Sequence, residues 1–210
     1  MSNTSLFSKD DEEVLIEIMN MGFGAACAEL ADALNTFITI SVPKVSMGSG
    51  RVITEFANEN ILANKELSIV EQGFWGNWNG ASYLAIPSEM VAEVLNILGF
   101  DEQEKKIEDL LDEERTMIFA QMSSLLINTC VGKISEILKE KNNFSAPHIL
   151  LDKVSGFSDE VFSADDQVVI AEARFSLNNN SIGGSLYITY NQDSFDWLRE
   201  SIDIFIRDNL

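Results

Sequence analysis

The sequence predicts an α+β fold in two similar halves related by a pseudo-twofold axis, with an antiparallel sheet and two long helices. The first observation is a pair of long apolar helical stretches, Glu13–Asn35 and Thr116–Lys139. The second is that strand-like runs and then a shorter helix follow each of them. The third is a constant spacing of 104 residues between matching landmarks, such as Gly80 and Gly184, each of which opens a strand.

This constant spacing indicates an internal duplication. Pro43 and Pro147 also lie 104 residues apart, each just after a long helix, and the strand GASYLAIP matches GSLYITYN at the same offset. An offset held over most of a chain is typical of a repeat. Repeats that share a sheet form one domain, so we predict a single domain over residues 1–210, with repeats at about 8–100 and 112–206. The order of the strands is left open.

The first half begins with a helix whose start carries a capping signal. Ser8-Lys9-Asp10-Asp11 resembles a capping box, with acidic residues in the first turn. FITISVPKVSM is then expected to be a strand that Pro43 ends or places at an edge. The other elements expected in this half are a strand at Ser49–Ala57, an irregular or helical segment at 58–65, a hairpin of Leu67–Trp75 and Gly80–Ile86, and a helix opened by Pro87-Ser88-Glu89.

The second half repeats this order. It starts with a charged segment, Asp101–Arg115, which is either a linker or the solvated beginning of the second long helix. The elements expected after that helix are strands at Asn143–Lys153, Val168–Leu177 and Ser181–Tyr190, and a closing helix at Ser194–Ile206.

The composition argues against two classes of partner. The chain has 34 acidic and 14 basic residues, for a net charge of −20. Nucleic acids and anionic membranes are bound through basic patches, so neither is expected as a partner. The N-terminus has no basic region followed by an apolar core, and no apolar run approaches the length of a membrane span. We therefore expect a cytoplasmic protein.

Side chains for nucleophilic or metal chemistry are scarce. Cys27 and Cys130 lie in the apolar helices without a CxxC pattern and are expected to be reduced core residues. His148 is the single histidine, so neither a catalytic triad nor a zinc site is expected. Trp75 and Trp78 lie at the tip of the predicted hairpin and are interpreted as packed against the core, with a protein contact as the alternative.

One face of the first long helix combines polar and small residues. At about 100° per residue, six positions fall within a strip of about 80°. We call this strip the first ridge, and its members are Glu13, Glu17, Asn20, Gly24, Ala28 and Ala31. A broad apolar face lies away from it, and a second apolar row flanks it, namely Val14, Ile18, Met21 and Ala25. We predict a helix packed on two sides, with the first ridge left open as a surface for docking and chemistry.

The duplication supplies an internal comparison for this ridge. At the offset of 104 residues, Glu17 corresponds to Gln121 and Asn20 to Ser124. The apolar positions of the two helices largely agree. Both halves have therefore kept the packing role of the helix, whereas only the first has a carboxylate and a carboxamide on its ridge.

The same helix carries a resemblance to a known family. EIMNMGFGAACAELADAL resembles the ExxNxxxG signature helix of the CheC/CheX/FliY phosphatases, which act on the chemotaxis response regulator CheY. FITISVPKV, GASYLAIP and the duplicated layout also look like CheC, over nearly all of the chain. The length is similar to that of a two-site CheC rather than the shorter CheX, and it leaves no room for the additional switch-complex domain of FliY. The resemblance implies a CheC-like fold.

For function, the resemblance implies a hydrolase that acts on the aspartyl phosphate of a CheY-type response regulator. Asn20 would hold the attacking water in line with the phosphorus, and Glu17 would pair with the regulator's active-site lysine. Glu13, Gly24 and Ala28 would belong to the docking surface. The regulator brings its own Mg²⁺, so no cofactor and no metal site are expected in this chain.

The chain departs from the family pattern at its second site, where Gln121-Met122-Ser123-Ser124 stands in place of a second ExxN. We expect this site to be degenerate and assign it no activity. Three alternatives stay open: an ordinary solvated helix face, a non-catalytic module that sequesters a response regulator or a CheD-like deamidase, and a structural adaptor at the flagellar switch. CheD enters only as a partner that the resemblance to CheC implies.

Overall fold

The computed structural model describes residues 8–41, 44–49, 67–97, 112–150, 167–177, 183–190 and 194–209. The fold is α+β, as the sequence predicts. The elements are α1 Lys9–Leu34, β1 Ile38–Ile40, β2 Lys44–Ser49, β3 Leu67–Trp75, β4 Gly80–Pro87, η1 Ser88–Met90, α3 Val91–Ile97, α4 Asp112–Ile137, β5 Asn143–Phe144, β6 His148–Leu150, β7 Gln167–Leu177, β8 Gly183–Tyr190 and α6 Phe195–Asn209.

The described strands form one antiparallel sheet to which both halves contribute. Its order is β1-β7-β8-β4-β3-β5, with β2 also paired to β7 and β6 also paired to β3. The first-half strands β1 and β2 therefore lie against β7, which belongs to the second half. The second-half strands β5 and β6 lie against β3 in the same way. The two halves exchange their edge strands.

A pseudo-twofold axis passes through the centre of the sheet and of the helical layer. The register of β4 and β8 places Tyr83 opposite Tyr187, and these two tyrosines are themselves 104 residues apart. Glu29 of α1 and Lys133 of α4 are also 104 residues apart, and the Lys133 Nζ lies 2.7 Å from the Glu29 Oε2. Equivalent residues of two repeats meet each other only near the axis that relates them.

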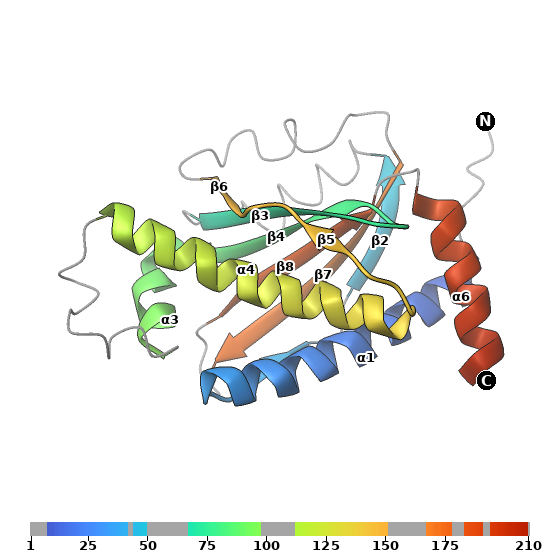
Figure 1. The fold of residues 1–210 in the computed structure, drawn as a ribbon, viewed down its shortest axis with the longest axis horizontal. Helices are drawn as coiled ribbons and strands as arrows, with labels where there is room; N and C mark the ends of the chain where they lie inside the picture. Colours follow the sequence, from blue (N-terminus) through green and yellow to red (C-terminus); the bar gives the residue numbers. More distant parts are fainter. Residues whose placement is uncertain are drawn as a thin grey trace.

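The two long helices lie side by side and antiparallel across one face of the sheet, while α3 and α6 lie at its opposite ends (Figure 1). One buried cluster joins the helices to alternate residues of the strands, including Leu84 and Ile86 of β4 and Leu186 and Ile188 of β8. Because strand side chains alternate between faces, this cluster fixes which face of the sheet the helices cover.

Both ends of α1 are capped by specific interactions, so the rotation of its faces is well defined. The Ser8 Oγ accepts a hydrogen bond from the Asp11 amide at 3.1 Å, and the Asp11 Oδ2 accepts one from the Ser8 amide at 2.8 Å. This is the predicted capping box. At the other end Asn35 adopts a left-handed conformation, with φ of 47°, and the helix stops there.

Two stretches predicted as single strands are interrupted. FITISVPKVSM yields β1 and β2, and the stretch predicted at Asn143–Lys153 yields β5 and β6. Pro147 lies in the second interruption. A proline has no amide hydrogen to donate to a neighbouring strand, so the strand pairing is broken there. The strand predicted at Ser49–Ala57 and the segment at 58–65 lie outside the described residues, apart from Ser49 at the end of β2.

The two hairpin tryptophans have different environments, so the prediction that both pack against the core is wrong for one of them. Trp78 is fully buried and stacks on Trp197 of α6, with ring centroids 5.8 Å apart. Trp75 is 48% exposed. The exposure of the two side chains differs because strand β3 ends at Trp75, and the following turn directs Trp78 back into the core.

The expectation about membrane-spanning length also needs a correction. Two helical segments, α1 and residues 116–137 of α4, are long and apolar enough by length and composition to cross a membrane. Core helices of soluble proteins meet the same criterion, and here both helices bury one face against the sheet. Length and composition alone are therefore weak evidence for a span.

Candidate functional site

The first ridge lies on the outer surface of α1. Glu13, Glu17, Gly24 and Ala28 are exposed, and Asn20 is half-buried. Within the described part of the chain, neither the Glu17 carboxylate nor the Asn20 carboxamide has a hydrogen bond or an ion pair with another residue. Residues three apart on a helix are neighbours on its surface, so the two groups form one exposed polar pair.

The rest of α1 explains why this ridge stays open. Its sheet-facing side is fully buried, with Leu15, Met19, Phe23, Ala26 and Leu30 in the core. The second apolar row is only partly packed, contrary to the prediction of a helix packed on two sides. Ile18 is buried, whereas Met21 and Ala25 are exposed. The exposed face is therefore wider than predicted and includes an apolar side chain next to the polar pair.

Two glycines of α1 define the limits of this face. A Cβ placed on Gly22 would lie 2.6 Å from the Ile134 Cγ1 and 3.1 Å from the Ile134 amide nitrogen, so Gly22 is where α1 and α4 approach each other most tightly among the described glycines of these helices. A Cβ on Gly24 would meet no atom within 4 Å. Gly24 therefore has open space in front of it and serves no close packing inside the described fold.

The exposed face of α4 at the positions equivalent to Glu13, Glu17, Asn20, Met21 and Gly24, which we call the second ridge, has a different chemistry. It comprises Met117, Gln121, Ser124, Leu125 and Asn128. Gln121 is exposed and Ser124 is half-buried, and the Asn128 Nδ2 donates a hydrogen bond to the Ser124 Oγ at 3.3 Å. Met117 is 60% exposed and Leu125 is 40% exposed. The second ridge is neutral and partly apolar. It has no carboxylate at the position equivalent to Glu17, where Gln121 stands, and no carboxamide at the position equivalent to Asn20, where Ser124 stands.

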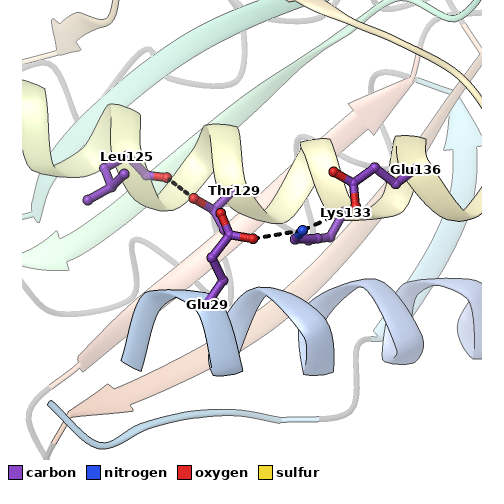
Figure 2. Close-up of polar contacts among 5 residues, drawn as sticks. All are labelled: Glu29, Leu125, Thr129, Lys133 and Glu136. Carbon is purple, nitrogen blue, oxygen red and sulfur yellow. Dashed lines mark hydrogen bonds and ion pairs between the residues drawn. The ribbon is translucent and has the colours of Figure 1, made fainter. Parts of the chain in front are cut away.

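An ion pair joins the two helices between these ridges. Figure 2 shows Glu29 reaching from α1 to Lys133 on α4, where it shares the ammonium group with Glu136 at 2.7 and 3.1 Å. The hydrogen bonds that Lys133 donates to Glu29 and, to a smaller extent, to Glu136 raise the pKa of Lys133 above its ordinary value. A paired, more basic lysine is a fixed cation and a poor general base, so we assign this group to the helix interface.

The two cysteines of the long helices are unsuited to nucleophilic chemistry. Cys27 and Cys130 are free thiols, and burial is the main cause that raises the pKa of each. Both stay protonated near neutral pH, so neither is an activated nucleophile. No group of three or more potential metal-ligating side chains occurs among the residues that the structure describes.

One small cavity lies on the face of the sheet away from the long helices. Its volume is about 190 Å³, and Ser41, Lys44, Glu172 and Arg174 line it. Glu172 is only 5% exposed, and the Arg174 Nε lies 3.4 Å from its Oε1. The sequence alone does not predict this group, because Ser41 and Lys44 lie about 130 positions before Glu172 and Arg174, and only the pairing of first-half strands with β7 brings them together.

His148 lies on the same sheet, at the edge strand β6. Its side chain is exposed, and its Nδ1 lies 3.8 Å from the Glu71 Oε2. No nucleophilic side chain stands beside it in these contacts. The sequence-based interpretation of His148 as a structural or surface residue agrees with this placement.

Comparison with known proteins connects the ridge-bearing helix to a family. Residues 13–47, which span most of α1, β1 and the start of β2, match the model of the CheC-like family. These residues include the whole first ridge.

Solved structures share the fold of nearly the whole chain. Thermotoga maritima FliY covers 95% of this chain and 98% of its own, at 18% identity and a TM-score of 0.69. The FliM middle domain of H. pylori covers 93% of this chain and 99% of its own, at 10% identity and a TM-score of 0.63. FliM in a FliG–FliM complex from H. pylori covers 90% and 98%, at 10% identity and a TM-score of 0.58. The chain is therefore similar to the CheC-like family over residues 13–47, and it shares the fold of FliY and the FliM middle domain over nearly its whole length.

Proposed function

We propose that the chain is an aspartyl-phosphate phosphatase that acts on a CheY-type response regulator in chemotaxis signalling, with one working site. The observation that carries this proposal is the exposed pair of Glu17 and Asn20 within the segment that matches the CheC-like family. Both groups lie on the outside of a helix whose opposite face is fully buried, so they are held in place and remain accessible to a partner protein.

In this proposal, Asn20 holds a water molecule in line with the phosphorus of the regulator's aspartyl phosphate. A neutral carboxamide both donates and accepts hydrogen bonds, so it binds water without repelling an anionic phosphoryl group. Hydrolysis of such a phosphate depends mainly on a positioned water and on stabilised charge. Because Asn20 is half-buried, its side chain has fewer rotamers than a fully exposed one, which favours the positioning role.

Glu17 fixes the register of docking in this proposal. Its exposed carboxylate has no partner among the described residues, so it is available to a lysine on the regulator. Gly24 and Ala28 continue the same ridge and allow the partner's backbone to come close, and Glu13 adds negative charge one turn before Glu17. In this proposal the regulator supplies the Mg²⁺ that the reaction needs.

The site at Gln121 and Ser124 is proposed to be inactive. Gln121 is exposed, but it has no charge to pair with a lysine, and the Ser124 hydroxyl is already an acceptor for Asn128. A shorter side chain at this position also leaves a water farther from the phosphorus than a carboxamide would.

The test is phosphate release from a phosphorylated CheY-type regulator with Mg²⁺. The wild-type chain is expected to accelerate release over the regulator's own decay. Asn20→Ala is expected to reduce this acceleration by about 10²–10³-fold, the usual cost of one preorganised polar group in a reaction site. Ser124→Ala is the matched control on α4 and should behave like the wild type. No acceleration by the wild type would exclude the enzyme, and an active Asn20→Ala variant would exclude this site.

A second candidate is a non-catalytic binding module, and the likeness to FliM favours it. One solved structure of this fold is a FliG–FliM complex, in which the FliM protein is one partner of an assembly. In that case the chain would sequester a response regulator, a CheD-like deamidase or a component of the flagellar switch. It would bind the phosphorylated regulator and slow or leave unchanged its loss of phosphate, so the same assay separates the two candidates. Either role places the chain in the cytoplasm.

A further inference from the structure

Large exposed apolar side chains are concentrated on the outer faces of the two long helices. Five such side chains occur among the described residues, namely Met21, Phe37, Trp75, Met117 and Leu125. Three of the five lie on α1 and α4. Single exposed apolar residues are ordinary on any protein surface, so their position relative to the polar pair is what matters.

Met21 stands next to the proposed reaction centre. It follows Asn20 directly and lies four residues after Glu17, about one helical turn along the same side of α1. It is 44% exposed, and the open space in front of Gly24 lies within one further turn. A partner that reaches both Glu17 and Asn20 therefore covers Met21 as well.

We propose that Met21 is a specificity-determining anchor, whose exposed apolar side chain packs against the response regulator beside the contacts of Glu17 and Asn20. This inference rests on the proposed function and adds a residue that the ExxN pattern does not contain. Flexible methionine side chains adapt to irregular apolar surfaces, which suits an anchor between two polar contacts. Burial of an apolar side chain at the centre of an interface is the usual source of binding energy there.

The second ridge provides a matched control for this residue. Leu125 is the equivalent of Met21 at the offset of 104 residues, and it is exposed to nearly the same extent, 40% against 44%. It differs in its neighbours, since Gln121 and Ser124 replace Glu17 and Asn20. If exposure at this position only reflected the packing of the repeat, truncating either side chain would have the same consequence.

The experiment measures binding and turnover with the regulator that serves as substrate in the phosphate-release assay. Binding is followed by calorimetry on that regulator activated with beryllofluoride and Mg²⁺. Met21→Ala is expected to weaken binding about tenfold, which corresponds to about 1.4 kcal/mol, and Leu125→Ala to leave it unchanged. The loss should appear in KM and not in kcat, and Met21→Leu should restore most of the affinity.

The salt dependence of binding distinguishes an apolar contact at Met21 from the charge contact of Glu17. The tenfold effect of Met21→Ala should persist at high salt, whereas the effect of Glu17→Gln should shrink because a charge pair is screened. Unchanged binding by Met21→Ala, or equal losses for Met21→Ala and Leu125→Ala, would overturn the inference while the phosphatase proposal stands. A wild-type chain that neither binds nor dephosphorylates the regulator would overturn both.

Discussion

At the scale of single residues, two glycines of α1 show that a residue needed for core packing can lie two positions from one that faces solvent. Gly22 and Gly24 are two positions apart on the same helix, yet one faces α4 and the other faces open space. Ile134, which stands against Gly22, is 1% exposed and cannot move away without disturbing the core. Gly22 is therefore needed by the fold, and Gly24 is not.

These surroundings predict opposite effects of the same substitution. Gly22→Ala is expected to lower the free energy of unfolding by about 1–3 kcal/mol through overpacking against Ile134. Gly24→Ala is expected to raise it by about 0.5–1 kcal/mol, because alanine is the better helix former and nothing opposes its methyl group. Urea denaturation of both variants measures these changes, and a destabilised Gly24→Ala variant would contradict the open environment.

The same pair separates stability from docking. If Gly24 allows the partner's backbone to come close, Gly24→Ala should be more stable than the wild type and still bind the regulator less tightly. This result would explain why the better helix former is not found at this position.

Part of this residue-scale pattern can be predicted from the sequence. The helical period correctly places Glu13, Glu17, Gly24 and Ala28 on an exposed face. It does not predict the exposure of Met21, since periodicity gives the angles between side chains but not the direction from which a second helix approaches. The contact of Gly22 with α4 decides that direction, and it depends on residues more than 100 positions away.

At the scale of elements, the repeated glycines that reveal the duplication have a structural cause. Gly80 opens β4 and Gly184 lies at the start of β8. A Cβ on Gly80 would collide with the Thr189 carbonyl oxygen, and a Cβ on Gly184 with the Ala85 carbonyl oxygen. Thr189 and Ala85 are themselves 104 residues apart, so the same close approach of β4 and β8 occurs at both ends of the pair.

Substitution of these two glycines should therefore give similar effects. We expect Gly80→Ala and Gly184→Ala each to destabilise the protein by about 1–3 kcal/mol, because the added methyl group forces neighbouring backbone apart. The two sites lie toward opposite ends of the strand pair, so the double variant should show roughly the sum of the single effects. Thermal or urea unfolding of the three variants provides the measurement. A harmless substitution at either glycine would argue against the symmetric close approach.

Element boundaries show where local sequence signals suffice. The capping box, the β3–β4 hairpin and the closing helix follow from nearby residues and were predicted within a few positions. The division of the predicted strands into β1 and β2 and into β5 and β6 was not predicted. That division depends on how each short strand meets its long neighbour, β7 or β3, at the edge of the sheet.

At the scale of the whole molecule, the exchange of edge strands makes the two halves dependent on each other. β7 is paired with two strands from the first half, and β3 with two from the second. Sequence periodicity predicts strands and their repeat, but it carries no direct information about which strand of one half pairs with the other half. The strand order could therefore be obtained only from the structure.

The exchange predicts that neither repeat folds alone. A chain of residues 8–100 would leave β4 without β8, β3 without β5 and β6, and the sheet-facing side of α1 without α4 and half of the core. The exposed strand edges and apolar surface would favour aggregation over folding. We expect residues 8–100 and 112–206 to lack cooperative unfolding when expressed separately.

The full chain should unfold in one transition, with far-UV circular dichroism and tryptophan fluorescence coincident. Fluorescence is a sensitive probe here, because Trp78 of the first half stacks on Trp197 of the second. Two separate transitions, or a cooperatively folded half, would show that the shared sheet does not bind the repeats into one folding unit.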